Sequence, residues 1–521
     1  MNKKRFFQNA LLLIIFTFLL RLVFTAFRVV IANKVGAECM GLYQLTFAIY
    51  GISVTFATSG INFAATRLVT QALTSGKFSF KSVMTRCIVY SLLFSSVAMI
   101  VILMYAEPIG RYILCDERCV LSLKAFAVSL PFISVSSAIS GYFYAVRNVS
   151  ITLISRFIEQ AAQIISFFIL MHLVPQGNLE ISCLCIVLSG AISEIFGGVF
   201  LIIYFFIKSH RQKSFKSRGI WKKIFEIALP SALGAYLKSG LQTIENVLIP
   251  VGFRKYGASK STALEGYGML CSMVMPVIFF PSFVLSSFSM LLIPEFTEAQ
   301  TREKQNEINK AANLSIKLTL MFSLFVSANF IVFGKPLGEV LYSSYKAGVL
   351  IEIMAPLIPF MYLDSIADGM LKGLGEYNRV LAYSSIDTVV SIAMIYFIVP
   401  KTGLYGYIAV VYISTMLNAF LSIRRLLVVS KNRINILSDI ALPFIFAFVS
   451  ANASKLLGNL FLSQNDALSV AVLLCISILI LALMIVFSKG NIYSTFKTAS
   501  NAVLSKKEKS HFKKQNCIEI S

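Results

Sequence analysis

The chain of 521 residues is 57% hydrophobic and 14% charged, and its mean hydropathy is +0.78. A soluble domain does not carry so many apolar residues, so we expect most of this chain to lie in lipid. The formal net charge of +23 is explained more simply by basic cytoplasmic loops than by nucleic acid, so no nucleic-acid partner is expected.

Apolar runs of about 20 residues, the length that crosses a bilayer as a helix, recur along the whole chain. They predict an all-α, polytopic membrane protein with about 14 transmembrane helices. The predicted spans are 8–33, 40–66, 83–106, 120–146, 151–174, 180–207, 223–250, 264–293, 311–333, 348–371, 378–400, 403–423, 438–457 and 467–488.

The first predicted span carries two arginines, Arg21 and Arg28. At about 100° per residue, a spacing of seven places both on one helix face. An arginine at mid-bilayer costs roughly 2.5 to 3.5 kcal/mol, so we expect this face to line a cationic cavity together with Lys238, suited to phosphate or pyrophosphate. Two alternatives stay open: Arg28 reaches the membrane interface, or Arg21 pairs with Glu159 or Glu194.

The sequence also repeats itself, with six spans followed by six spans in the same orientation. At one constant offset along the chain, Pro131 meets Pro359 and Gly141 meets Gly369. A parallel repeat of this kind, with a central cleft between two lobes, is typical of transporters. The predicted division is an N-lobe at 1–210, a C-lobe at 211–430, two further helices at 431–490 and a basic cytoplasmic tail at 491–521.

Acidic residues inside the predicted spans gather in the second half, at Glu245, Asp364, Asp368 and Asp387. Such oxygen ligands can hold Na⁺ or relay a proton, and the alternative is hydrogen bonding between helices. Asp364 and Asp368 are four residues apart, so they share a helix face and repel each other if both are ionised. With Glu159 of the first half, these two are candidate gating or cavity acids.

Motifs for catalysis are absent from the sequence. It contains no Walker A motif, no G-x-S-x-G and no H-E-x-x-H, so we expect no enzyme activity, no cofactor and no metal other than a coupling Na⁺. Transport would then draw on an ion gradient, the membrane potential or the substrate gradient. Among nine cysteines only Cys115 and Cys119 are candidates for a disulfide, and free thiols are the alternative.

Three stretches resemble a known family: Gly36 to Val69, Ile139 to Gln160 and Phe279 to Ala299. They are similar to the polysaccharide-transporter branch of the multidrug/oligosaccharidyl-lipid/polysaccharide exporter superfamily. Within that branch they resemble the stage V sporulation protein B family, which is related to lipid II flippases.

The resemblance implies two six-helix lobes, alternating access and translocation of an undecaprenyl-pyrophosphate-linked saccharide, as in cell-wall or spore-cortex synthesis. It matches Arg21 and Arg28 to arginines needed in the first helix of the flippases, and it maps a sodium site onto Glu245, Asp387 and Thr415. The implied partners are a lipid-linked oligosaccharide, membrane lipids and wall-synthesis proteins. Two other functions stay open, a cation-coupled multidrug exporter and a non-transporting membrane scaffold for wall synthesis.

Basic residues gather in alternate connections between the spans. The segment 207–223 alone holds seven Lys or Arg residues, and the tail after residue 488 is also basic. Because cytoplasmic loops carry this excess, we expect both termini on the cytoplasmic side of a bacterial cell membrane. The largest exception is "FRKYGASK", Phe253 to Lys260, which the same count places outside.

This topology predicts which positions a membrane-impermeant thiol reagent reaches from outside. Single cysteines near Gly177 and Lys401 should be labelled in intact cells, because both lie in predicted external connections. A cysteine at Ser214, in the basic segment, should react only after the membrane is opened. Labelling of Ser214→Cys in intact cells would reverse the assignment.

Overall fold

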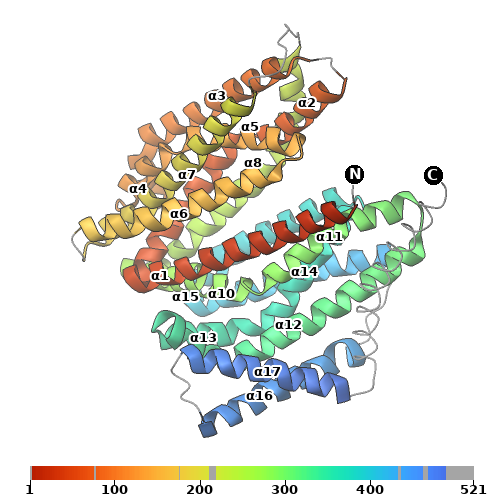
Figure 1. Ribbon diagram of the computed structural model, residues 1–521. Helices are drawn as coiled ribbons and strands as arrows, with labels where there is room; N and C mark the ends of the chain where they lie inside the picture. Colours follow the sequence, from red (N-terminus) through yellow and green to blue (C-terminus); the bar gives the residue numbers. More distant parts are fainter. Residues whose placement is uncertain are drawn as a thin grey trace, which may run out of the picture. The chain divides into compact units, whose positions relative to one another are not determined.

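The computed structural model describes residues 3–75, 78–174, 177–209, 219–431, 436–461 and 467–487 (Figure 1). Within these ranges the chain is almost wholly helical and holds no β-strand, which confirms the predicted all-α fold. The elements are α1 (Lys3–Thr58), α2 (Ile61–Ser75), α3 (Phe80–Pro108), η1 (Ile109–Ile113), α4 (Cys119–Ala127), α5 (Leu130–Ala145), α6 (Val149–Leu173), α7 (Leu179–Ser209), α8 (Ile220–Lys255), α9 (Lys260–Gly268), η2 (Met269–Val274), α10 (Met275–Phe279), α11 (Ser282–Thr301), α12 (Gln305–Tyr342), α13 (Tyr345–Met354), η3 (Ala355–Leu357), α14 (Ile358–Gly373), α15 (Tyr377–Ser430), η4 (Ile436–Ala441), α16 (Leu442–Phe461) and α17 (Ala467–Phe487).

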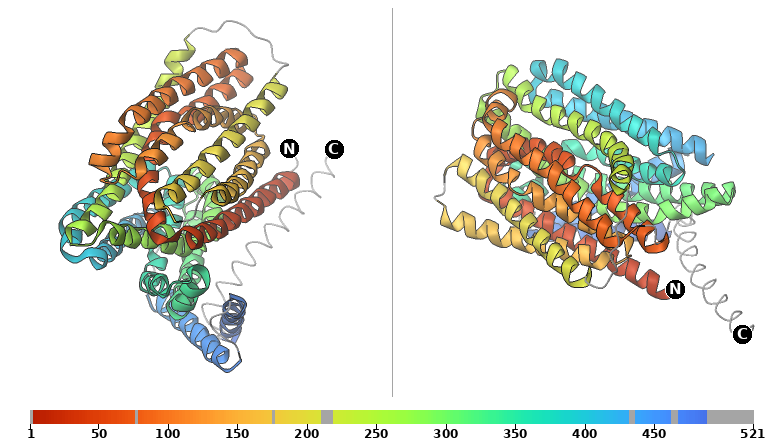
Figure 2. Two further views of the ribbon diagram at one scale, coloured as in Figure 1. Left: turned by 90° about the vertical axis from the view of Figure 1, so that its left-hand side faces the viewer. Right: turned by 90° about the horizontal axis from the view of Figure 1, so that it is seen from above.

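Two of these helices are interrupted by a glycine. The 56 residues of α1 contain Gly36, with φ 81°, and the 54 residues of α15 contain Gly403, with φ 61°. Positive φ is readily adopted by glycine, which has no Cβ. Each break lies at the junction of two predicted spans, so α1 and α15 each consist of two segments. The first segment of α1 is the dark red helix of Figures 1 and 2.

Membrane-spanning character is clear from the length and composition of the helices. Among the described residues, eight helices are long and apolar enough to cross a bilayer, and nine if α4 and α5, which meet at 41°, form one broken span. The chain is therefore a multi-pass membrane protein, as predicted. The expected number of about 14 spans stays a prediction.

The helix boundaries repeat at the offset seen in the sequence. Leu130 and Ile358, the first residues of α5 and α14, keep the offset that relates Pro131 to Pro359, and both helices are 16 residues long. Each has a proline in its first turn, where the missing N–H costs nothing. The helices that follow, α6 and α15, begin at Val149 and Tyr377, again at the same offset.

The chain divides into two compact units by its internal contacts. Unit 1 comprises 1–276 and 388–410, and unit 2 comprises 277–387 and 411–521. Unit 1 thus extends past the predicted lobe boundary at residue 210, because α8 and α9 pack against α1. The division into lobes at 1–210 and 211–430 stays a prediction, and the expected tail at 491–521 lies outside the described residues.

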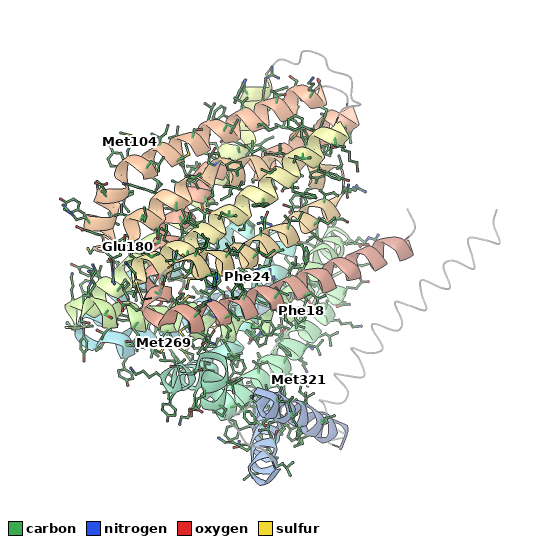
Figure 3. All side chains as sticks on the ribbon, turned by 60° about the vertical axis from the view of Figure 1, so that its left-hand side comes forward. Phe18, Phe24, Met104, Glu180, Met269 and Met321 are labelled. Atoms are coloured by element: carbon green, nitrogen blue, oxygen red, sulfur yellow. The ribbon has the colours of Figure 1, made fainter. Side chains whose placement is uncertain are left out.

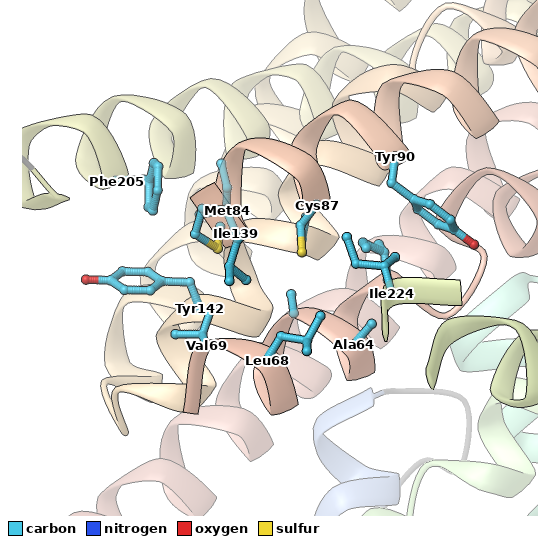
Figure 4. Packing of buried hydrophobic residues seen from close by; sticks show 14 of the residues in the cluster. Ala64, Leu68, Val69, Met84, Cys87, Tyr90, Ile139, Tyr142, Phe205 and Ile224 are labelled. Carbon is cyan, nitrogen blue, oxygen red and sulfur yellow. The ribbon is translucent and has the colours of Figure 1, made fainter. Parts of the chain in front are cut away.

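A tightly packed cluster joins α2, α3, α5, α7 and the start of α8 in unit 1 (Figure 4). Leu68, Cys87 and Ile224 are completely buried in it. Nearby, the Ser134 hydroxyl donates to the carbonyl oxygen of Ala57 at 2.7 Å and approaches that of Ser91 at 3.2 Å. In a membrane, close packing and small polar residues of this kind hold helices together.

The first half of the sequence packs closely against the second half where α1 crosses α9 and η2. A Cβ on Gly41 would lie 2.1 Å from the carbonyl oxygen of Leu264, and one on Gly268 would lie 2.1 Å from that of Ala37. Only glycine allows the two backbones to meet at this distance. We call this contact the glycine seam.

Replacing a seam glycine should push the two helices apart. We expect Gly41→Ala to lower the free energy of unfolding by about 1–3 kcal/mol, as overpacking does, and to lower the melting temperature of the purified protein. Gly51→Ala is the matched control, because it lies on the same helix with no heavy atom within 4 Å of the added Cβ. Equal melting temperatures for the two variants would contradict the seam.

Candidate functional site

A groove of about 520 Å³ lies in unit 1 along the exposed side of α2. Its lining residues come from α2 and from the end of α5, and they are Asn62, Phe63, Thr66, Arg67, Thr70, Gln71 and Tyr144. On α2 they form two adjacent rows with helical spacing of four, one polar and one containing the arginine. We call this site the α2 groove.

Local sequence explains why α2 lies where it does. Ser59 and Gly60 both have positive φ, 44° and 70°, and they separate α2 from α1. Gly141 of α5 then lets the two helices touch, since a Cβ there would lie 2.7 Å from the carbonyl oxygen of Asn62. The Asn62 amide donates to the carbonyl oxygen of Ser137 at 3.0 Å, and the Thr66 hydroxyl approaches that of Gly141 at 3.1 Å.

The chemical character of the groove is set by Arg67 and two aromatic rings. Phe63 is 66% exposed and Tyr144 is 43% exposed, so both rings are available to a ligand. Within the described part of the chain Arg67 forms no ion pair and no hydrogen bond, so its guanidinium has no acid to neutralise it. A cation between apolar walls suits an anionic group attached to an apolar or ring-shaped body.

Sequence reasoning assigned no role to Arg67, although it lies inside one of the stretches that carry the family resemblance. The signal was present: "NFAATRLVTQ" places Asn62, Thr66 and Thr70 at intervals of four on a helix whose other face is apolar. What the sequence does not contain is the approach of α5 that turns this face into a groove.

The predicted cations lie on two helices of unit 1 that pack together, α1 and α8. Arg21 and Lys238 are exposed. Arg28 is half-buried and lies over the ring of Phe24, with 5.7 Å between Cζ and the ring centroid, and it also interacts with Tyr43. Phe18 and Phe24 mark this segment of α1 in Figure 3. The cationic cavity formed by Arg21, Arg28 and Lys238 stays a prediction.

Glu159 has an arginine partner from its own helix, α6. Arg156 Nη1 lies 2.8 Å from Glu159 Oε2, and the Ser155 hydroxyl donates to Oε1 at 3.2 Å. The carboxylate packs on Gly197 of α7, where a Cβ would lie 2.4 Å from Oε1. Arg156 therefore provides the positive charge that a largely buried carboxylate needs in a membrane.

In unit 2 the predicted acids of α14 face the second segment of α15. Asn418 Nδ2 donates to Asp364 Oδ2 at 2.8 Å, and the Ser422 hydroxyl lies 3.4 Å from Asp368 Oδ1. Both pairs are separated by 54 residues, so the two helices run parallel here. Asp364 and Asp368 share a face, as predicted, and they make the helix-to-helix hydrogen bonds that the sequence left as an alternative.

One carboxylate oxygen in this row is unsatisfied. Asp364 Oδ1 is buried and has no hydrogen-bond partner among the described residues. Leaving such an atom bare is costly in a membrane interior, and a proton or a cation is the chemical species that satisfies it. Asp368 is 3.7 Å from Lys372 Nζ on the same helix, so its charge is partly compensated.

The residues expected to bind a coupling ion are divided between the units. Glu245 is half-buried on α8 of unit 1, whereas Asp387 and Thr415 are half-buried on α15 of unit 2. The Ser414 hydroxyl, next to Thr415 in sequence, donates to Asp387 Oδ1 at 2.5 Å. No group of three His, Cys, Asp or Glu side chains in the described ranges is arranged to hold a metal ion.

Comparison with known proteins finds a matching family and several relatives. A family model described as polysaccharide biosynthesis protein matches residues 6–300. Stage V sporulation protein B of Bacillus subtilis (strain 168) is 23% identical over 416 residues, covering 78% of this chain and 80% of the relative. The lipid II flippase MurJ of the same organism is 20% identical over 448 residues, covering 78% and 80%.

The fold has a counterpart among solved structures. The lipid II flippase MurJ in an inward closed conformation superimposes with a TM-score of 0.68 at 13% identity, covering 90% of this chain and 96% of the other. At this identity the likeness concerns the fold alone. Together the matches confirm the resemblance that the three sequence stretches indicated.

Proposed function

The chain belongs to the polysaccharide biosynthesis protein family, and from that premise we propose that it is a flippase for an undecaprenyl-pyrophosphate-linked saccharide. It carries this lipid across the cytoplasmic membrane by alternating access, with both termini in the cytoplasm. The substrate is a peptidoglycan precursor such as lipid II or a related polysaccharide unit. Relatives named for sporulation and for lipid II flipping support the wall or spore cortex as its destination and wall-synthesis proteins as its partners.

The α2 groove is the observation that carries the proposal. A polyprenyl pyrophosphate saccharide combines a strong anion, an apolar chain and sugar rings, and the groove offers a guanidinium that has no counter-ion among the described residues, beside two exposed rings. Arg67 binds the pyrophosphate there, and Phe63 and Tyr144 contact the parts next to it. A volume of about 520 Å³ is within the range of small-molecule sites.

Arg21, Arg28 and Lys238 serve as further contacts for the pyrophosphate during translocation. All four cations belong to unit 1, on α1, α2 and α8. A multidrug exporter for organic cations would need an acidic, aromatic cavity instead, and the positive charge of the α2 groove argues against that activity. A scaffold without transport would not depend on any of these arginines.

Transport is coupled to Na⁺ or H⁺ in this proposal. Glu245, Asp387 and Thr415 form the ion site, with the Ser414 hydroxyl holding Asp387 in place. Glu159, Asp364 and Asp368 are the cavity acids, and the bare Oδ1 of Asp364 is the atom best placed to take up a proton.

Arginine substitutions test the substrate. Arg67→Ala and Arg21→Ala should each lower flipping of the lipid-linked saccharide about tenfold or more per inserted molecule, because a charge-assisted hydrogen bond is worth about 1.5–3 kcal/mol. The lysine variants keep the charge but lose the bidentate fork, so they should retain partial activity. Arg28→Ala should be milder, since that side chain can reach the interface.

The measurement is transport in proteoliposomes, with depletion in cells as a second readout, where the same lipid should accumulate. Arg86→Gln is the control, because Arg86 lies on α3 and donates to the Ser82 hydroxyl outside the α2 groove. Normal flipping by both alanine variants would reject the pyrophosphate role. A fall in melting temperature with normal flipping would instead assign Arg21 to an internal ion pair.

Sodium dependence tests the ion site. Asp387→Asn and Glu245→Gln should each remove the stimulation of transport by Na⁺, because each takes one negative charge from the proposed coordination sphere. Glu352→Gln is the control. Glu352 Oε2 lies 3.5 Å from Lys335 Nζ, and neither residue belongs to the proposed ion site. If both site variants keep the sodium dependence of the parent, the site lies elsewhere.

A further inference from the structure

A single buried carboxylate in the connection between α3 and α4 gathers charges from other parts of unit 1. Asp116 is 2% exposed. Its Oδ2 lies 2.8 Å from Arg118 Nη2, and its Oδ1 accepts from the Arg118 backbone N–H at 3.1 Å. Lys260 Nζ, at the first residue of α9, lies 3.2 Å from Oδ1.

Arg118 extends this network to α1. Arg118 Nη1 lies 3.1 Å from Glu38 Oε1, and Glu38 Oε2 accepts the Ser261 hydroxyl of α9 at 2.6 Å. On the far side, Arg254 of α8 donates to the carbonyl oxygen of Cys115 at 3.2 Å. Cys115 is exposed, Cys119 is buried, and both are free thiols, which is one of the two alternatives that the sequence left open.

Residues of α1, α8 and α9 thus converge on one short turn. The space left among them is about 10 Å³, which is at the lower limit for a single water molecule. Burial of the Asp116 carboxylate strengthens its ion pairs relative to those on an open surface, although Lys260 at the outer side of the network is 46% exposed. Separating α1 and α9 from the turn would take Glu38 and Lys260 away from Arg118 and Asp116.

The network lies at the end of the glycine seam. Lys260, Leu264 and Gly268 are spaced by four along α9, so they form one row. Leu264 and Gly268 make the close backbone contacts with α1, and Lys260 at the start of the same row reaches Asp116. The seam and the ion pairs therefore hold the same two elements together.

The same network involves the basic segment that departs from the expected charge distribution. The segment Phe253 to Lys260 was the largest exception to the expected distribution of basic residues. Two of its cations, Arg254 and Lys260, are engaged by the turn at Cys115 and Asp116. These contacts give a structural reason for basic residues at a position that the expected charge distribution leaves unexplained.

We propose that Asp116 is the centre of an ionic latch that closes the external break of α1 near Gly36 against the start of α9 and must break before the protein opens to the outside. The latch joins the first half of the sequence to the first helices of the second half. Its external position rests on the topology of the proposed function, and its existence as a closing device is tested without any substrate.

The latch is charged at physiological pH. Burial opposes ionisation of Asp116, but the hydrogen bonds and charge of Arg118, with Lys260, outweigh it and hold the pKa of this carboxyl below its usual value. The other charged groups that face it are Glu38 of α1 and Arg254 of α8. Because the pKa is lowered, the ion pairs are present above the ordinary carboxyl range and are lost only in stronger acid. Opening is therefore not triggered by pH between 5 and 8.

Access to the latch can be measured with a thiol at Ala263, which is 1% exposed and lines the small space beside Asp116. Ala263→Cys is introduced into the full chain with the exposed Cys115 and Cys475 replaced by serine. Labelling by a membrane-impermeant maleimide is followed in intact cells and in inverted vesicles, and the background without Ala263→Cys is subtracted. Asp116→Asn and Lys260→Gln should each raise the external labelling rate at least about threefold.

Glu117→Gln is the matched control, because Glu117 is the next residue but forms an exposed pair with Arg111. Its labelling rate should equal that of the parent, and comparison at one pH cancels the reactivity of the thiol itself. Because Asp116→Asn removes the pair with Arg118 as well as the pair with Lys260, the double variant Asp116→Asn with Lys260→Gln should label no faster than Asp116→Asn alone. If Asp116→Asn does not insert, Lys260→Gln carries the test.

Three results would overturn the latch. They are equal labelling of Asp116→Asn, Lys260→Gln and Glu117→Gln, a double variant that labels faster than Asp116→Asn, or a parent rate that changes several-fold relative to that of Asp116→Asn between pH 5 and 8. Faster labelling from inverted vesicles only would support the latch and reject the proposed topology. A working latch in a protein that flips no lipid would reject the proposed substrate alone.

Discussion

A bilayer offers no water to its interior, so every polar group within a membrane-spanning helix must find a partner inside the protein or face a hydrated space. This constraint accounts for most of what distinguishes one helix of this chain from another. Where the side chains of two helices hydrogen-bond to each other, the helices run side by side at a fixed register. This is the case for α14 and α15, through Asp364 with Asn418 and Asp368 with Ser422. Where a charge has no partner in the part of the chain that the structure describes, as at Arg67, a ligand is the natural complement.

The same constraint explains where the backbone departs from a regular helix. Gly36, Gly60 and Gly403 take positive φ at the points where α1, α2 and α15 change direction. Each change of direction redirects a face of the helix, and at Gly60 it turns α2 onto α5. Because helices in lipid associate through close packing, the small residues at these crossings decide which faces remain open to a ligand.

How far the sequence foretells this arrangement depends on the distance over which a feature is determined. Apolar runs and their ends are local, so the breaks at Gly36 and Gly403 fall at junctions of predicted spans. The family resemblance is spread over many residues and survives low identity. The α2 groove, by contrast, requires Gly141 to meet α2, and the ion pairs of Asp116 require residues from α1, α8 and α9. Such contacts between distant segments leave no periodic pattern, and the basic "FRKYGASK" segment was visible only as an exception.

The unbroken offset between α5 and α14, and between the starts of α6 and α15, shows that from the start of α5 to the start of α6 neither copy has gained or lost a residue relative to the other. Side chains in the two copies have diverged freely, since Ser136 and Ser140 stand where the second copy has Asp364 and Asp368. The length of this region has not changed between the two copies, and helical geometry gives the reason. One inserted residue would turn all that follows by about 100° and carry these carboxylates away from Asn418 and Ser422. In this region the protein tolerates a substitution at a given position far more readily than an insertion or a deletion.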